Sequence, residues 1–402
     1  MTVLNNPPLV LSALTATSCI GHGSAQTIAA LHAQRSGLAP CQFETVDLPT
    51  WIGRVGEVDA QSLPAAFRRY ECRNNRLAEL ALRADGFAEA VRDAAGRLGP
   101  ERVGVFLGTS TSGMLETELA YRHRSASDGS LPDSFDYGGT HNAFSLVDFV
   151  RRRLQLEGPA AALSSACASS AKAFAAGRRM IAAGVIDAAL VGGVDSLCLT
   201  TLYGFNALQL LSPGPCRPFD LRRDGLSIGE AAAFALMERA PASMDRAAVM
   251  LLGAGESNDA HHMSAPHPDG LGARLAIEAA LSDAGLAAAD IDYVNLHGTG
   301  TPSNDRAESL AVEAVFGPTL ACSSTKGATG HTLGAAGALE AVLAALCLRE
   351  NLLPGGLHTR HVDPQLAVNY LTANRRAPAA RILSNSFGFG GVNCSLILGL
   401  AG

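Results

Sequence analysis

Short apolar runs recur along the chain and predict buried strands. They cover residues 103–108, 188–193, 249–253 and 293–296. Runs this short, rich in Val, Leu and Ala, are typical of strands that are covered on both faces. Each is followed by a glycine-containing turn and a helical stretch, and this alternation predicts an α/β fold with helices on both faces of a sheet.

Longer segments repeat an apolar residue every three or four positions, which is the spacing of one helix face. Pro354-Gly-Gly356 ends the last of these patterns, because neither residue type continues a helix. The segments predict helices over residues 77–98, 171–184, 272–284, 306–315 and 335–349.

Composition supports a large packed core. The chain has 402 residues, of which 48% are hydrophobic and 17% charged, enough for one large α/β domain or two average ones. The net charge of −6 argues against a broad nucleic-acid surface. Arginines nevertheless cluster, and each cluster is either a solvated helix face or a docking site for an acidic partner. The clusters include Arg68 with Arg69, Arg122 with Arg124, and residues 151–153.

Cysteine usage and the N-terminal sequence bear on location. The nine cysteines form no Cys-x-x-Cys motif, so we expect no metal or redox pair and a reducing compartment. The first residues lack the basic start and apolar core of a signal peptide. No run is long and apolar enough to cross a bilayer. The sequence therefore predicts a cytoplasmic protein without a membrane span.

Cys167 is a candidate nucleophile. It lies among small residues directly before the predicted helix over 171–184. Backbone N–H groups at the start of a helix carry partial positive charge, so a cysteine there can be stabilised as a thiolate. A thiolate of this kind attacks carbonyl carbon, which indicates acyl chemistry.

Two histidines lie in Gly/Thr-rich segments outside the predicted helices. His297 follows a predicted strand, and His331 ends the segment that begins at Lys326. Neutral imidazoles that donate N–H bonds would stabilise an enolate oxygen while an acyl group waits on sulfur. Lys326 and Glu340 are either an ion pair that orients the site or ordinary surface charges.

The segment 384–393 is rich in Gly and Phe and predicts a loop where backbone comes close to a ligand. Its N–H groups could stabilise an oxyanion and its aromatic rings could gate the cavity. A glycine-rich entry into a strand is the plainer alternative. A cysteine hydrolase would also use Cys and His, but it has little use for a second histidine in a matching loop.

Four segments resemble the motifs of type I and II β-ketoacyl-acyl-carrier-protein synthases, which are condensing enzymes of the thiolase superfamily. These segments are residues 165–170 around Cys167, 297–305, 326–337 and 385–393. A fifth segment, from Arg217-Pro-Phe-Asp220 to Gly229-Glu230, is similar to the central signature of the family, so the likeness extends over most of the chain.

This resemblance implies a thiolase-like five-layer αβαβα fold with two topologically similar halves. The N-terminal half, residues 1–250, would carry the nucleophile, and the C-terminal half, residues 251–402, both histidines. It also implies a homodimer, or a heterodimer with a related ketosynthase-like subunit. No resident cofactor or metal is implied, because phosphopantetheine arrives on the acyl carrier protein.

The resemblance assigns roles as well. Cys167 would accept the acyl chain, while His297 and His331 would assist decarboxylation of malonyl-carrier protein. The product would be a β-ketoacyl chain of fatty-acid, lipid, polyene or polyketide biosynthesis. The other implied sites are the oxyanion hole at the N–H groups of Cys167 and Phe389, the gate at Phe387 and Phe389, the supporting charges Lys326 and Glu340, substrate contacts at Thr299, Thr301 and Gly390, and carrier docking at Arg68, Arg69, Arg122 and Arg124.

Departures from the family pattern indicate a specialised paralogue. Residues 229–233 read Gly-Glu-Ala-Ala-Ala instead of Gly-Glu-Gly-Ala-Gly.

Two related alternative functions stay open. A thiolase would carry a second reactive cysteine, and the surroundings of Cys394 lack that motif. A chain-length-determining partner subunit typically lacks the nucleophile that Cys167 supplies here.

Overall fold

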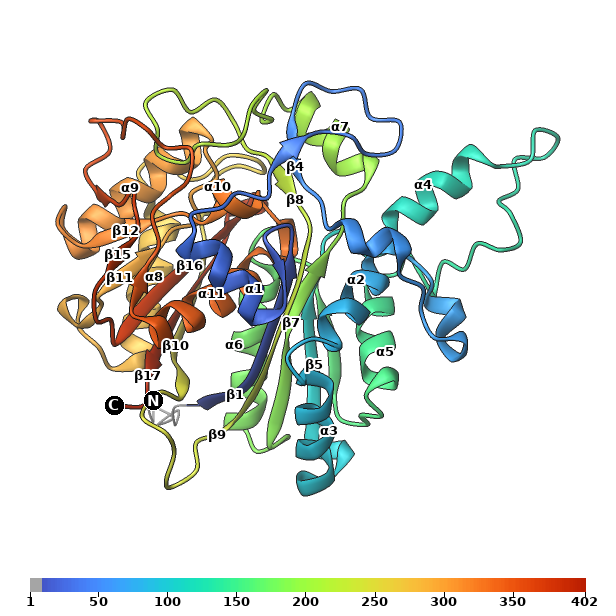
Figure 1. Ribbon diagram of the computed structural model, residues 1–402, viewed down its shortest axis with the longest axis horizontal. Helices are drawn as coiled ribbons and strands as arrows, with labels where there is room; N and C mark the ends of the chain where they lie inside the picture. Colours follow the sequence, from blue (N-terminus) through green and yellow to red (C-terminus); the bar gives the residue numbers. More distant parts are fainter. Residues whose placement is uncertain (1–8) are drawn as a thin grey trace.

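The computed structural model describes residues 9–402 and is built on one sheet of twelve strands (Figure 1). Its strands follow the order β14-β12-β11-β16-β17-β10-β1-β9-β7-β5-β6, with β2 beside β1. In the middle, β1 and β10 share only two residue pairs, Leu9 with Leu251 and Val10 with Met250. The sheet therefore consists of two halves joined by a short seam.

The two half-sheets use different parts of the chain. The first contains β1 (Leu9–Ser18), β5 (Val103–Gly108), β6 (Ala160–Leu163), β7 (Ala188–Asp195) and β9 (Ala231–Arg239). The second contains β10 (Val249–Asn258), β11 (Tyr293–Asn295), β12 (Ala321–Ser323), β14 (Asn369–Tyr370), β16 (Arg381–Gly388) and β17 (Val392–Leu400). The chain passes from the first half-sheet to the second in the connection between β9 and β10. The division into two domains near residue 250 stays a prediction.

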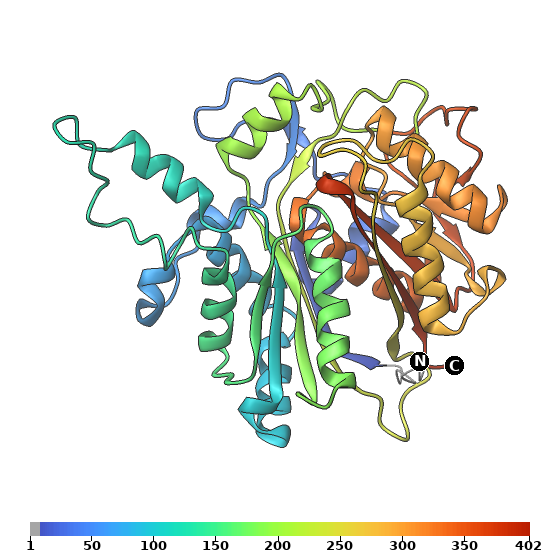
Figure 2. The same ribbon diagram turned by 180° about the vertical axis from the view of Figure 1, so that it is seen from behind.

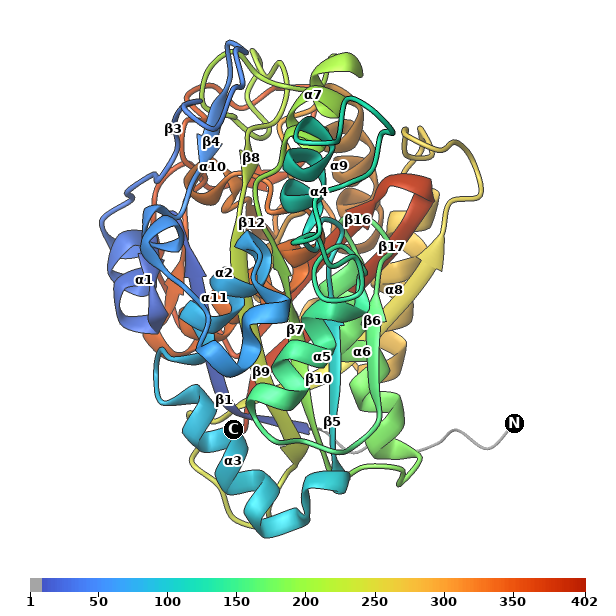
Figure 3. The same ribbon diagram turned by 90° about the vertical axis from the view of Figure 1, so that its right-hand side faces the viewer.

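Helices form three layers around the half-sheets, which gives the expected αβαβα order (Figures 1 and 2). The central layer holds α6 (Ser169–Ala182) and α11 (Ala336–Glu350). Residues 336–348 of α11 are all buried, as a helix between two sheets requires. The outer helices are α2 (Arg73–Leu82), α3 (Phe87–Leu98) and α5 (Phe144–Arg153) on the first half-sheet (Figure 3), and α8 (Leu271–Ala284) and α9 (Pro302–Phe316) on the second.

Smaller elements complete the fold at the ends of the half-sheets. They are β2 (Gly21–His22), α1 (Gly23–His32), β3 (Ala39–Pro40), β4 (Trp51–Gly53), α4 (Met114–Arg122), α7 (Leu199–Ala207), β8 (Ile228–Gly229), α10 (Lys326–Thr329), β13 (Leu352–Leu353) and β15 (Arg375–Arg376). Helix α4 and the chain that follows it extend away from the body of the molecule (Figure 2).

The predicted strands are confirmed, whereas one predicted helix is wrong. The single helix expected over 77–98 is two helices, α2 and α3. Asp85 and Gly86 both have left-handed backbone, with φ of 57° and 67°, which a right-handed helix cannot accommodate. The helix expected over 171–184 begins earlier, at Ser169, and ends at Ala182.

Two glycines bring α6 close to the strand ends beneath it. A Cβ on Gly108, the last residue of β5, would lie 2.3 Å from the backbone nitrogen of Ser170. A Cβ on Gly193 in β7 would lie 2.5 Å from Cβ of Ser170. Because glycine has no side chain, the first turn of α6 rests directly on both strands. This contact fixes the height of Cys167 above the sheet.

No helix within residues 9–402 is long and apolar enough to cross a membrane. All nine cysteines are free thiols.

A buried ion pair ties the first half of the fold together. Arg73 of α2 binds both carboxylate oxygens of Glu230, at 2.6 and 2.8 Å. The two side chains are 3% and 0% exposed, so neither charge is solvated. Glu230 also accepts the backbone N–H groups of Val55 and Leu197. One carboxylate therefore organises a helix and two loops.

Arg73→Met should lower the free energy of unfolding by about 3–5 kcal/mol, because Glu230 is then left as a buried charge without its cation. Urea denaturation at pH 7 measures the change. The matched control is Arg92→Met, which removes an exposed ion pair with Glu89 and should cost within about 1 kcal/mol. Equal losses in the two variants would contradict a structural role for the buried pair.

Candidate active site

Cys167 lies in the turn between β6 and α6. Ala166, directly before it, has φ of +50°, a left-handed conformation that is uncommon for a residue with a side chain. Two hydrogen bonds hold this turn: the hydroxyl of Ser169 donates to the carbonyl of Ala166, and the N–H of Ser165 donates to the Ser169 hydroxyl. The strained turn points the thiol away from the helix and into a cavity.

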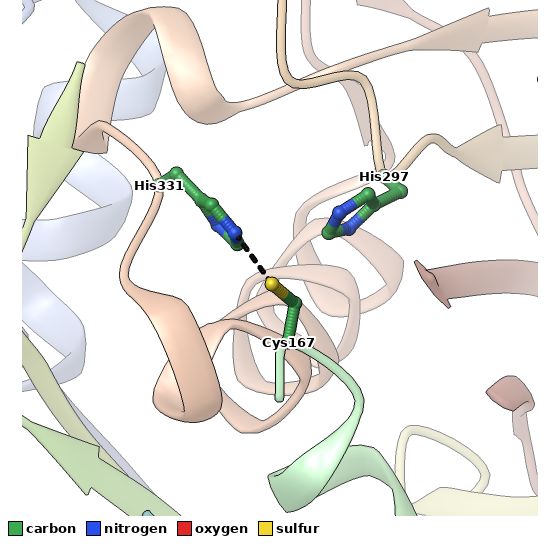
Figure 4. Close-up of side chains that lie close together, drawn as sticks. All are labelled: Cys167, His297 and His331. Atoms are coloured by element: carbon green, nitrogen blue, oxygen red, sulfur yellow. Dashed lines mark hydrogen bonds between the residues drawn. The ribbon is translucent and has the colours of Figure 1, made fainter. Parts of the chain in front are cut away.

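Both histidines reach the same cavity from the C-terminal half (Figure 4). Nε2 of His331 lies 2.9 Å from Sγ of Cys167. The His297 ring stands nearly perpendicular to the His331 ring, with centroids 5.2 Å apart. The backbone N–H of His331 donates to the carbonyl of Ser227, beside β8. Thus the three groups that the sequence singled out converge.

The cavity that these groups share has a volume of about 60 Å³. Thr299 and Thr301 line it and are bonded to each other through their hydroxyls at 2.9 Å. Its aromatic lining is Phe205, Phe387 and Phe389. The rings of Phe205 and Phe389 stack with centroids 5.6 Å apart, and the Phe387 ring lies 6.0 Å from that of His297.

Both imidazoles are neutral at pH 7. Burial lowers the pKa of His297 well below its ordinary value, and the charges of Lys326 and His331 act in the same direction. Burial and Lys326 likewise lower the pKa of His331. Charging either ring would place a second cation beside Lys326 in a buried site. This agrees with the neutral imidazoles expected from the sequence.

The protonation state expected for Cys167 is wrong. Burial raises the pKa of the thiol to about 11, although Lys326 and the backbone N–H groups of Phe389 and Cys167 act in the opposite direction. Cys167 lies two residues before the first residue of α6, and loss of hydration outweighs the helix dipole. The resting thiol is therefore protonated, and Nε2 of His331 is placed to accept its proton.

The Gly/Phe-rich loop lies against the nucleophile turn. A Cβ on Gly388 would lie 3.1 Å from the backbone nitrogen of Cys167. The backbone N–H groups of Phe389 and Cys167 both act to lower the pKa of the Cys167 thiol, so both lie near its sulfur. Donors in this position could stabilise an oxyanion formed beside the sulfur.

Lys326 and Glu340 form a buried ion pair, which decides between the two alternatives that the sequence left open. Their side chains are 1% and 2% exposed. Nζ of Lys326 also donates to the carbonyl of His297 at 2.5 Å and lies 3.4 Å from Nδ1 of the same residue. Burial raises the pKa of Glu340 to about 7, against the effect of Lys326.

Glu308 of α9 is a site residue that the sequence reasoning missed. Its carboxylate accepts the N–H groups of His297 and Gly298, both at 2.7 Å, and the side-chain amide of Asn385 at 3.1 Å. Burial raises its pKa to about 7. The available signal was an acidic residue on the helix after the His297 loop, since such a loop exposes N–H groups that need an acceptor.

Other predicted site residues lie outside the cavity. Gly390 is exposed, and its N–H donates to the carbonyl of Met263. Arg68 and Arg69 belong to a 3₁₀ turn over Ala65–Tyr70, Arg122 ends α4, and Arg124 follows it. All four guanidinium groups are on the surface, where Arg69 pairs with Asp136 and Arg122 bonds to Thr45.

The cluster also has the ligand types of a metal site. Sγ of Cys167 and one nitrogen from each histidine lie within 4.8 Å of one another. A soft divalent cation takes such ligands. The same closeness lets the three groups act on one thioester, with the sulfur as nucleophile and the rings as proton carriers.

Two family profiles match the chain. They are described as "Beta-ketoacyl synthase, N-terminal domain", over residues 12–242, and "Beta-ketoacyl synthase, C-terminal domain", over residues 248–360.

Individual relatives agree with these profiles. The mitochondrial 3-oxoacyl-[acyl-carrier-protein] synthase of Arabidopsis thaliana is 39% identical over 266 residues, which cover 62% of this chain and 58% of the relative. The 3-oxoacyl-[acyl-carrier-protein] synthase 2 of Rhizobium meliloti is 40% identical over 264 residues, 62% of each chain. The chain thus spans less than two thirds of the length of these relatives.

Structural similarity covers more of the chain. One chain of a complex between a ketosynthase and its chain length factor from Xenorhabdus doucetiae matches with a TM-score of 0.88 and 39% identity. The match covers 98% of both chains. The thiolase-like arrangement of the two half-sheets is therefore shared along nearly the whole sequence.

Alkylation of Cys167 by iodoacetamide should accelerate about 100-fold between pH 7 and pH 9, because the thiolate fraction rises about tenfold per pH unit below a pKa of about 11. Peptide mass spectrometry measures the rate at this residue, and Cys167→Ala identifies its adduct. A rate that stops rising by pH 8 would show that the thiol is already ionised there.

Proposed function

The chain belongs to the β-ketoacyl synthase family, and from that membership we propose that it catalyses the decarboxylative Claisen condensation of an acyl chain with malonyl-acyl carrier protein. The observation that carries this proposal is the meeting of Cys167 with two neutral histidines in one buried cavity. Residues 1–250 supply the nucleophile and residues 251–402 supply both imidazoles. No resident cofactor is needed, since the phosphopantetheine arm arrives on the carrier protein.

The first step is transfer of the acyl chain to sulfur. Sγ of Cys167 attacks the thioester carbonyl while Nε2 of His331 accepts the thiol proton. The N–H groups of Cys167 and Phe389 stabilise the oxyanion. When the carbonyl re-forms, the bond to the carrier sulfur breaks, and His331 returns its proton to that sulfur. Acyl-Cys167 and a free carrier thiol remain.

The second step is decarboxylation of the malonyl group. The bond to the carboxylate breaks, carbon dioxide leaves, and the electron pair stays as an enolate. Lys326 donates toward Nδ1 of His297, which leaves the ring proton on Nε2 to stabilise the enolate oxygen. Nδ1 of His331 is buried and has no hydrogen-bond partner within residues 9–402. The tautomer is therefore held only by the contact of Nε2 with the Cys167 sulfur. When the acyl group replaces the thiol proton this contact no longer donates, and the ring can carry its proton on Nε2 in the next step.

The third step joins the two units. The enolate carbon attacks the carbonyl of acyl-Cys167, a carbon–carbon bond forms and the carbon–sulfur bond breaks. The β-ketoacyl chain leaves on the carrier protein, and the cysteine thiolate takes up a proton from water, which is the one proton that the overall reaction consumes. Thr299 and Thr301 line the route for the pantetheine arm, and Phe387 and Phe389, the latter stacked on Phe205, form the gate that opens to admit it.

A chain-length-determining subunit is the alternative role within this family. Such a subunit needs a cavity wall but no nucleophile. Here Cys167, His297 and His331 are all present and in contact, which favours the condensing enzyme.

We also propose how the protein assembles and where it acts. Helix α4 and the chain after it project from the body and expose Tyr121, Tyr137 and Phe144 by 54%, 58% and 39%. Exposed aromatics of this kind fit a partner surface, either a second copy or a related ketosynthase-like subunit. The product enters a specialised lipid, polyene or polyketide pathway in the cytoplasm.

Cys167→Ala should abolish transfer of an acyl group from acyl-carrier protein, which intact-mass spectrometry detects as loss of the added chain. The variant His297→Ala should still accept the acyl group on Cys167, but it should release carbon dioxide from malonyl-carrier protein at least about 100-fold more slowly. The controls are Cys347→Ala, a buried thiol in α11, and His123→Ala, which is exposed. Normal decarboxylation by His297→Ala would refute its assigned role.

Carrier docking makes a separate prediction. Arg68→Glu combined with Arg122→Glu should raise KM for carrier protein several-fold and leave kcat nearly unchanged, because rim charges act on encounter and not on chemistry. Steady-state kinetics at low salt measures both. Arg92→Glu combined with Arg97→Glu, two α3 side chains that are 40% and 61% exposed, is the charge-matched control. An equal rise in KM for that control would refute the assigned docking site.

A further inference from the structure

A second cavity, of about 350 Å³, lies among the loops that precede β8 and follow β13. It shares none of its lining residues with the cavity around Cys167. The loops lie at the upper left of Figure 1. The lining is Pro215, Arg217, Asp220, Arg222, His358, Arg360 and His361.

Asp220 builds this cavity by joining its two walls. Its carboxylate accepts the backbone N–H groups of Arg222 at 2.8 Å, Arg360 at 2.8 Å and His361 at 3.0 Å. The N–H of Leu221 also donates to the carbonyl of His361 at 2.8 Å. These bonds fix the backbone at Arg222 and Arg360 before any ligand arrives, which lowers the entropy lost on binding.

The charges in the cavity are not balanced. No carboxylate within residues 9–402 forms an ion pair with Arg222 or Arg360, and both side chains are exposed. Arg217 pairs with Asp224 through one terminal nitrogen, but its Nε is buried without a partner. Nε2 of His358 is also buried without a partner in the same part of the chain. Buried donors of this kind are normally satisfied by a ligand or by water.

We infer that this cavity binds a phosphate group. Planar guanidinium groups bind phosphate oxygens through paired N–H bonds, and several of them around a small concave space match a tetrahedral anion. The volume suits a phosphate ester and is too small for a protein helix.

A second basic groove on the surface has arginines whose charges are already paired. It is lined by Arg69, Arg151 and Arg152, among others. Each of these arginines already pairs with a carboxylate, Arg69 with Asp136 and the other two with Asp148. A free anion gains less there, so the cavity around Asp220 is the stronger site.

The phosphate has two chemical sources. It can be inorganic phosphate, or the phosphodiester of a carrier-borne arm. The position of the cavity favours the second source, because the segment that carries Arg217 and Arg222 also contacts the His297 loop. The N–H of Gly225 donates to the carbonyl of Gly300 in that loop at 3.1 Å.

Isothermal titration at low ionic strength tests the site, with inorganic phosphate and pantetheine 4′-phosphate as probes and pantetheine as the uncharged control. The variant is Arg222→Gln with Arg360→Gln. The control is Arg246→Gln, an exposed arginine in the loop between β9 and β10 at the bottom of Figure 1. The double variant should bind at least about tenfold more weakly, equivalent to about 1.4 kcal/mol, while the control binds as the wild type.

Binding of inorganic phosphate that the double variant loses assigns a free anion. Binding of the ester alone, lost in the same variant, assigns the carrier arm. The inference is overturned if neither probe binds saturably, or if the double variant binds as tightly as the wild type. Cys167→Ala should bind both probes normally, so failure of the proposed condensation and failure of this site are distinguishable.

Discussion

The buried ion pair between Lys326 and Glu340 lies directly behind His297, where its ammonium group bonds the carbonyl of that residue. The positive charge opposes protonation of both imidazoles and favours loss of the proton from Cys167. Because all these groups are buried, the field is not screened by water. Burial is the larger cause of the pKa shift in all three groups, and this one fixed cation adds to it at the imidazoles and opposes it at the thiol. Glu340 makes the burial of the cation tolerable.

Convergence of the reacting groups depends on packing far from the chemistry. Helix α6 approaches its strands through Gly108 and Gly193, and this contact places Cys167. Glu308 holds the His297 loop by two backbone N–H groups. Asp195, at the end of β7, accepts the N–H groups of Thr111 and Gly334 and so joins the strand ends to the His331 segment. Each reacting side chain is thus positioned by a rigid element of the fold.

Local patterns in the sequence were sufficient for the strands, for the α/β class and for the three residues that meet in the cavity, because apolar runs and Gly/Thr loops are features of neighbouring residues. Such patterns could not predict properties that arise from contacts between segments far apart in the sequence. The raised pKa of Cys167 depends on how completely the fold removes water. Glu308 acts through a loop ten residues earlier, and Asp220 joins loops 140 residues apart. The break between α2 and α3 has a local cause at Asp85 and Gly86, but the apolar periodicity on both sides concealed it.

The stack of Phe205 on Phe389 has a kinetic consequence. With the rings 5.6 Å apart, the space beside Cys167 holds about 60 Å³, room for only a few water molecules. A hydrocarbon tail of more than a few carbons exceeds that, so a ligand with such a tail could reach the sulfur only after the two rings separate. Its entry could then be no faster than this separation, and a group bound to the sulfur would be shielded from water for as long as the rings stay together.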